Sequence, residues 1–184
     1  TVNVSPLEIG KELNVTLTLD NTNEPISGSN TVSVTVNKDY NWVSLGTGTF
    51  ADVLAFTEKP YDVEIQKADG FDRYRVMKPY EQGLKNDDGG WGNAVASTSC
   101  DYIEFWIKDG IIYYNKFFIG INYDGSASNA IYAHHPSDFA GISLANNKQL
   151  DDKTFQLAPY YYIEVLQGGF DYTGEGGSIL ITLP

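Results

Sequence analysis

The chain has 184 residues, with 24 acidic and 12 basic side chains and a formal net charge of −12. This charge excludes a basic stripe able to neutralise phosphates, so we expect no nucleic acid partner. It also argues against binding to an anionic membrane surface. No apolar run approaches the roughly 18 residues of a transmembrane helix, so we expect no direct membrane insertion within this chain.

Tyr, Val, Ile and Thr dominate the patterned segments, and the chain has 13 tyrosines. These residue types favour strands. Eight to ten short segments alternate between apolar and polar residues, and no helical pattern supports a βαβ unit. The sequence therefore predicts an all-β fold, an antiparallel β-sandwich built from hairpins with little or no helix.

Residues 1–39 form a separate unit in this pattern. Apolar residues alternate from Leu13 to Leu19 and again from Val32 to Val36, on either side of a polar stretch. Two strands and a loop cannot bury a core alone. We expect them to be either the first strands of the main sheet or the remnant of an upstream immunoglobulin-like domain, with the main domain at 40–184.

The polar stretch within this unit carries the best calcium candidates. Carboxylate and amide oxygens are the hard ligands that Ca²⁺ prefers. An EF-hand spacing is absent, so solvated turn residues remain the alternative, and calcium is the one cofactor that the sequence suggests. The candidate ligands are Asp20, Asn21, Asn23 and Glu24.

The segment 61–80 is predicted to be a β-hairpin. Two alternating runs flank Asp69-Gly70, a pair typical of a two-residue type I′ turn. The resulting register places apolar pairs on one face and polar or charged pairs on the other. These pairs are Val63 with Val76, Ile65 with Tyr74, Gln66 with Arg73, and Glu64 with Arg75.

A longer pattern includes this hairpin: Trp42-x-x-Leu45-Gly46-x-Gly48-x-Phe50-x-Asp52, then Tyr61-x-Val63-x-Ile65-Gln66, Tyr74-Arg75-Val76 and Pro79-Tyr80. It resembles a segment found in secreted and surface lipoproteins of Bacteroidetes, often after an immunoglobulin-like or Calx-β-like module. The resemblance covers residues 42–80. It implies an all-β fold and an extracytoplasmic location, either secreted or at the outer-membrane surface, and it supplies no catalytic residues.

A second hairpin is predicted around Asp109-Gly110, between Tyr102–Lys108 and residues 111–117. Its register pairs Ile107 with Ile112, Phe105 with Tyr114, Trp106 with Tyr113, and Glu104 with Asn115. Because both faces are rich in apolar or aromatic groups, we expect this hairpin to be central in its sheet.

Carbohydrate binding is the most specific functional hypothesis. Aromatic rings stack on the apolar faces of sugars, and neighbouring polar side chains bond to the hydroxyl groups. Core or cross-strand packing is the usual role of such rings and remains the alternative. The candidates are Trp106, Tyr113, Tyr102, Glu104 and Asn115 on the second hairpin, Trp91 in a Gly-rich loop, and the run Tyr160-Tyr161-Tyr162.

Enzymatic candidates are weaker. A catalytic triad needs groups from separate segments, whereas these serine, histidine and aspartate residues lie within five positions. Cys100 has no nearby base, and paired acids in loops diverge. The candidates weighed are His134, His135, Ser137 and Asp138, Cys100, and the pairs Asp87-Asp88 and Asp151-Asp152.

The function expected from the sequence is a non-catalytic, extracytoplasmic module of a surface lipoprotein, with a polysaccharide or other surface proteins as partners. Two alternatives stay open. One is a carbohydrate-active enzyme of the glycoside hydrolase type, and the other is a purely structural, adhesin-like spacer domain.

Overall fold

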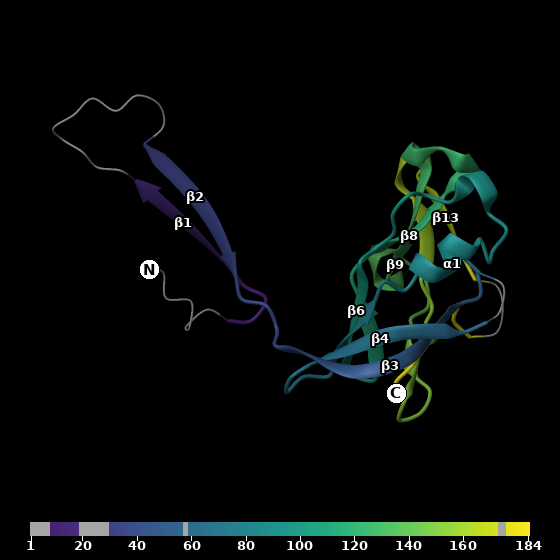
Figure 1. Cartoon of the computed structure of the whole chain (residues 1–184), viewed down its shortest axis with the longest axis horizontal. Helices are drawn as coiled ribbons and strands as arrows, with labels where there is room; N and C mark the ends of the chain where they lie inside the picture. Colours follow the sequence, from purple (N-terminus) through teal and green to yellow (C-terminus); the bar gives the residue numbers. More distant parts are fainter. Residues whose placement is uncertain (1–7, 19–29, 57–58, 173–175) are drawn as a thin grey trace. The chain divides into compact units, whose positions relative to one another are not determined.

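The computed structural model describes residues 8–18, 30–56, 59–172 and 176–184. The fold is all-β with antiparallel sheets, as the sequence predicts (Figure 1). The chain divides into two compact units, Thr1–Asn41 and Trp42–Pro184.

The first unit contains the two predicted strands, β1 (Glu12–Thr18) and β2 (Thr31–Asn37), paired antiparallel. Leu13, Val15 and Leu17 lie opposite Val36, Val34 and Val32. Because a single two-stranded sheet has no second layer, its apolar side chains are not buried: Leu17 is 57% exposed and Val32 is 60% exposed.

An eight-stranded antiparallel sheet forms the larger part of the second unit. Its order is β10-β11-β14-β3-β4-β5-β6-β7. The two ends of this sheet approach each other, since the Ile112 N–H donates a hydrogen bond of 3.0 Å to the Asn147 carbonyl, next to β10. The strands are β3 (Trp42–Asp52), β4 (Tyr61–Ala68), β5 (Arg73–Met77), β6 (Tyr102–Lys108), β7 (Ile111–Tyr114), β10 (Lys148–Gln149), β11 (Thr154–Leu157) and β14 (Ile179–Thr182).

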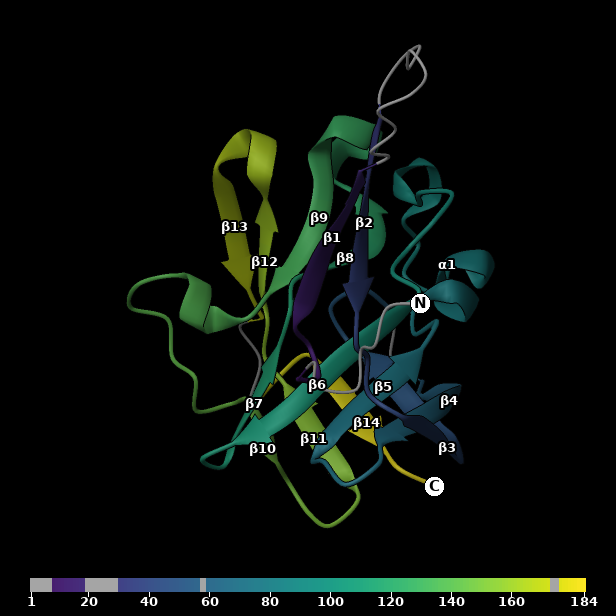
Figure 2. The ribbon, with the colours of Figure 1, turned by 90° about the vertical axis from the view of Figure 1, so that its left-hand side faces the viewer.

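A four-stranded antiparallel sheet forms the other layer, in the order β13-β12-β9-β8 (Figure 2). Its strands are β8 (Phe117–Asn122), β9 (Ala130–His134), β12 (Tyr160–Ile163) and β13 (Gly168–Asp171). The short helix α1 (Glu81–Asn86) follows β5. Single 3₁₀ turns are η1 (Gly92–Ala94), η2 (Tyr123–Gly125), η3 (Ala127–Asn129), η4 (Pro136–Asp138) and η5 (Glu164–Leu166).

The core lies where the inward faces of both sheets meet. Alternation along each strand places every second side chain in this layer. Fully buried residues come from the large sheet (Phe50, Ile65, Val76, Ile103, Phe105, Phe155 and Ile181) and from the small one (Ile119, Ile121, Ile131, Ala133 and Tyr161).

The predicted register of the first hairpin is wrong by two residues. Ile65 lies opposite Val76 and Gln66 opposite Arg75. Only Gly70 of the turn pair has a positive φ, of 77°, whereas a type I′ turn needs two. The turn therefore comprises residues 69–72. The shift of the register by two residues keeps each side chain on its predicted face of the sheet but changes its cross-strand partner.

The predicted register of the second hairpin is confirmed from Phe105–Tyr114 to Ile107–Ile112. Asp109 and Gly110 both have positive φ, of 53° and 77°, as a type I′ turn requires. The predicted central position is wrong, because β7 ends the eight-stranded order.

Two elements have no clear sequence signal. Helix α1 is short, polar and contains Gly83, and β13 lies in the Gly-rich stretch 168–177. Gly169 is required there because a Cβ atom would lie 2.3 Å from the Tyr161 carbonyl oxygen.

The glycines of β3 have distinct structural roles. Gly46, with φ of 105°, lies at a break in the β3–β4 register after Ser44. Gly48 faces β14, where a Cβ atom would lie 2.3 Å from the Thr182 carbonyl oxygen. The first glycine permits a bulge and the second a close approach, the two roles that a glycine within a strand usually has.

Asp52 at the end of β3 links the two sheets and is only 1% exposed. Its carboxylate accepts hydrogen bonds from the Tyr80 hydroxyl at 2.7 Å and the Tyr161 hydroxyl at 3.0 Å. The backbone N–H groups of Leu54 and Ala55 donate at 3.0 and 3.3 Å. Because Tyr161 belongs to β12, this carboxylate joins the small sheet to the large one.

Burial raises the pKa of Asp52 to about 6, although the four hydrogen bonds oppose this change. The native state therefore binds a proton more tightly than the unfolded chain. This contribution to stability is complete below about pH 4 and is lost as the pH rises through 6. A rise of about two pKa units corresponds to about 3 kcal/mol of free energy of unfolding.

Asp52→Asn should abolish this dependence. Between pH 4 and pH 7, the free energy of unfolding of the wild type should fall by about 3 kcal/mol relative to that of the variant. Urea titrations followed by tryptophan fluorescence measure it, and all three tryptophans (42, 91 and 106) lie in the second unit. The exposed substitution Asp62→Asn controls for net charge, and a pH-independent difference for Asp52→Asn would contradict the assignment.

Candidate functional site

The outward face of strands β3 to β7 carries a row of aromatic and charged side chains. The alternation that buries Tyr74, Val76, Ile103 and Phe105 turns the intervening residues away from the core. We call this row the arginine–aromatic face. It consists of Trp42, Arg73, Arg75, Tyr102, Glu104, Trp106 and Tyr113.

Both guanidinium groups of this face lie over aromatic rings. The Arg73 guanidinium carbon is 4.3 Å from the Trp106 ring centroid. That of Arg75 is 3.9 Å from the Trp42 ring and 4.2 Å from the Tyr102 ring. The Trp106 and Tyr113 rings, opposite each other across β6 and β7, are inclined by only 19°. Cation–π attraction thus fixes the orientation of these rings.

Glu104 binds both arginines. One carboxylate oxygen contacts Arg73 Nη1, and the other accepts a hydrogen bond from Arg75 Nε at 2.8 Å. The side chains of Arg73, Arg75 and Glu104 are only 20%, 14% and 12% exposed, respectively. The predicted acidic partner of Arg75, Glu64, is instead exposed and accepts a hydrogen bond from Gln66. The prediction failed because Glu104 comes from β6, which the local pattern does not place beside β5.

A hollow adjoins this face at the end of β5. Its volume is about 580 Å³, within the usual range of ligand sites. Met77, which lies opposite Tyr102, connects it to the arginine–aromatic face. Exposed acids and a lysine pair contribute polar groups, and the lining includes Asp62, Glu64, Met77, Lys78, Glu81, Gln82, Lys85 and Asn86.

Four of the predicted glycan-binding residues lie together on the arginine–aromatic face: Tyr102, Glu104, Trp106 and Tyr113. Asn115 is exposed beyond the end of β7, which stops at Tyr114. Trp91 lies elsewhere, and its indole N–H donates a hydrogen bond of 2.5 Å to the Ala55 carbonyl. Trp42 opens the sequence pattern at residues 42–80 but was not among the predicted glycan-binding residues.

The tyrosine run 160–162 is divided between two environments. Tyr161 is fully buried beside Asp52. Tyr160 and Tyr162 are half-buried on the outward face of the small sheet, where the Phe139 ring packs on both, at 4.8 and 5.1 Å between centroids. Packing between these rings therefore occupies much of the second aromatic surface.

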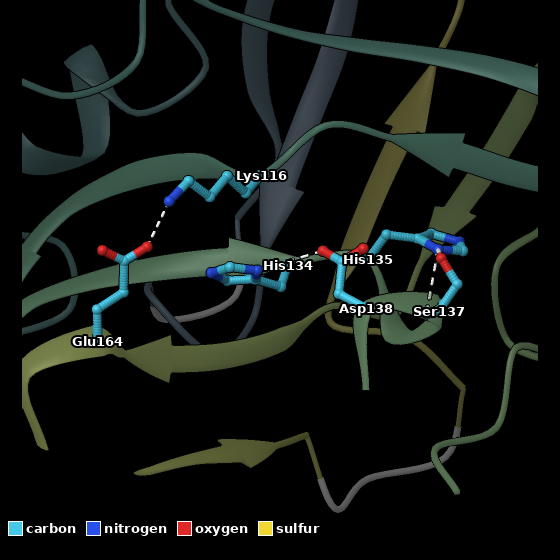
Figure 3. Close-up of polar contacts among 6 residues, drawn as sticks. All are labelled: Lys116, His134, His135, Ser137, Asp138 and Glu164. Atoms are coloured by element: carbon cyan, nitrogen blue, oxygen red, sulfur yellow. Dashed lines mark hydrogen bonds and ion pairs between the residues drawn. The ribbon is translucent and has the colours of Figure 1, made fainter. Parts of the chain in front are cut away.

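The histidine candidates form two separate pairs (Figure 3). His135, 2% exposed, accepts the Ser137 backbone N–H at Nδ1 and contacts its hydroxyl at 2.6 Å, while Nε2 lies 3.1 Å from the Ile112 carbonyl. The proton therefore resides on Nε2, and burial lowers the pKa of His135. Asp138 instead contacts His134 Nδ1 at 3.3 Å. Serine and carboxylate thus meet different histidines, and His135 caps η4 rather than serving a catalytic triad.

Two of the acidic candidates, Asp87 and Asp151, have structural partners. Asp87 accepts hydrogen bonds from the backbone N–H groups of Trp91 and Gly92. Asp151 accepts from Lys153 and Thr154, and these bonds lower its pKa. Burial raises the pKa of the Cys100 thiol to about 12, so it is a poor nucleophile at neutral pH.

The calcium candidates Asp20, Asn21, Asn23 and Glu24 lie outside the described residues. Within the described ranges, no three His, Cys, Asp or Glu side chains gather as a metal site would require. Over the same ranges, no helix has both the length and the hydropathy needed to cross a membrane.

Glu104→Gln should destabilise the second unit, because two largely buried guanidinium groups lose their shared carboxylate charge. We expect the free energy of unfolding to fall by about 1–3 kcal/mol. Glu64→Gln is the matched control, since Glu64 is exposed, and should change it by less than about 0.5 kcal/mol. Urea titration measures both. Equal effects for the two variants would mean that Glu104 does not hold the arginines in place.

Comparisons with protein-family models, with curated proteins and with solved structures found no match. The resemblance of residues 42–80 to surface lipoproteins thus stays an expectation, and function has to be argued from the geometry. Within the described residues, the arginine–aromatic face and its adjoining hollow form the site that this geometry favours.

Proposed function

We propose that this chain is a non-catalytic carbohydrate-binding module that binds a polysaccharide across the arginine–aromatic face and the adjoining hollow. The main observation in support of this proposal is that aromatic rings, guanidinium groups and acids form one continuous surface beside a hollow of about 580 Å³. From the resemblance of residues 42–80, we place the module outside the cytoplasm, as part of a surface lipoprotein.

The chemistry of the face suits a sugar chain. Sugars present apolar ring faces and many hydroxyl groups, and they bind where aromatic rings lie beside hydrogen-bonding side chains. The arginines hold Trp42, Tyr102 and Trp106 in fixed orientations, so little conformational entropy is lost on binding. In the hollow, Asp62 and Glu64 are exposed acceptors for hydroxyl groups.

The position of Asp52 favours binding over hydrolysis. A glycosidase needs a protonated carboxylic acid near the sugar. Asp52 is a carboxylate whose pKa burial raises, but it is only 1% exposed beneath Tyr80 and Tyr161, so it cannot reach a sugar on the surface. The other alternative is a spacer domain. Such a domain would not require this surface of aromatic and charged side chains, except for packing.

A glycan array, run with calcium and again with EDTA, tests the proposal. Trp106→Ala and the double variant Asp62→Ala/Glu64→Ala should each weaken binding at least about tenfold, because each removes contacts to the sugar. The double variant alters exposed side chains only, so its loss of affinity cannot come from unfolding. Tyr123→Ala, at a residue 51% exposed in η2, is the control and should bind like wild type.

Unchanged binding in both site variants would move the site elsewhere. Binding lost only in EDTA would direct attention to the calcium candidates at residues 20–24. If wild type binds no glycan in either condition, the carbohydrate proposal fails and the spacer alternative becomes the better account.

A further inference from the structure

A second hollow lies beside α1. It is a groove of about 400 Å³ between the helix and the segment that leads into β6. Both hollows are lined by Lys78, Glu81 and Lys85, so they are neighbours around this helix. On the side opposite α1, the groove is lined by residues 95–101.

The segment 95–100 is attached to β8 only at its two ends. Val95 forms a bridge with Ile121, and the Ala96 N–H donates to the Gly120 carbonyl at 2.9 Å. At the other end the Cys100 N–H donates to the Phe118 carbonyl at 3.0 Å. Gly120 allows the close packing here, since a Cβ atom would lie 2.3 Å from the Leu84 side chain and 2.9 Å from that of Ser99.

The three residues between these attachments leave their polar groups open to the groove. Across the described ranges, Ser97, Thr98 and Ser99 form no hydrogen bond through either their backbone N–H groups or their hydroxyls. Three hydroxyls can both donate and accept, and three N–H groups can donate. Such a set of groups, lining a hollow of this volume, is suited to a ligand with many hydroxyl groups.

The charges of the groove favour a neutral ligand. Lys78 and Glu81 form an ion pair of 3.1 Å. Within the described part of the chain, the side chains of Lys85 and Asp101 form no hydrogen bond or ion pair, so one cation and one anion remain. An anion would gain nothing from this balance, and it would be repelled by the net charge of −12.

Leu84, Val95 and Ala96 add apolar surface to the groove. We propose that the groove is a second subsite that binds one unit of a neutral oligosaccharide, whose chain runs from the arginine–aromatic face past α1. This inference rests on the proposed function and deepens it: the glycan class is neutral rather than acidic, and the bound stretch is several units long.

The test is a titration of the ¹⁵N-labelled chain followed in ¹H–¹⁵N correlation spectra. The ligands are neutral hexasaccharides of glucose, mannose and xylose, with an oligogalacturonate as the acidic comparison. The amides of residues 97–100 report on the groove, and the Trp106 indole reports on the arginine–aromatic face. We expect both reporters to shift with at least one neutral hexasaccharide, at concentrations where oligogalacturonate shifts neither.

The outcomes separate the two proposals. If the Trp106 indole shifts but the amides 97–100 do not, the groove inference is overturned and the proposed function stands. If neither reporter responds to any sugar, both are overturned. An oligogalacturonate that binds as tightly as the neutral sugars would overturn the inferred glycan class.

Two matched variants test for a sugar contact at Lys85, which lines both hollows. Lys85→Ala removes the unpaired cation of the groove and should weaken binding of the neutral hexasaccharide about three- to tenfold, the effect of one lost hydrogen bond. Lys148→Ala removes an exposed lysine of β10 and should leave the affinity unchanged. Equal affinities for the two variants would contradict a contact at Lys85.

Discussion

The central constraint on this fold is a buried carboxylate that has no cationic partner among the described residues. Asp52 is held by four hydrogen-bond donors that come from the turn after β3, from the connection between β5 and α1, and from β12. These donors compensate for only part of its desolvation, as its raised pKa shows. In return, two distant segments are fixed around the end of β3, and the phenol of Tyr161 orients the small sheet relative to the large one.

The candidate site depends indirectly on the hydrogen bonds around Asp52. Strands β3 to β7 bury one face against the core that Asp52 helps to fix, and the other face then carries alternating residues in a set register. Within that register Glu104 meets two guanidinium groups, and each guanidinium meets a ring. The site is therefore a consequence of strand pairing, and not of a loop that could vary independently.

Much of the fold could be predicted, since strand alternation and the turn at Asp109-Gly110 are local signals. Asp69-Gly70 shows the limit of such signals: the same dipeptide adopts a longer turn, so the register moved by two residues. The arginine–aromatic face was predicted only in part. Its aromatic residues on β6 and β7 follow from one hairpin, whereas the contacts of Arg73 and Arg75 need β5 beside β6 and Trp42 nearby. The requirement for glycine at position 48 likewise comes from β14, which lies more than a hundred residues away in the sequence.

The contact between β7 and the segment before β10 bears on self-association. An open strand edge is a template for another chain, and it is a common origin of aggregation. At Ile112 this edge is occupied twice: its N–H donates to the Asn147 carbonyl, and its carbonyl accepts from His135 Nε2. Addition of a foreign strand would first have to break both bonds, so this end of the sheet is protected against edge-to-edge polymerisation.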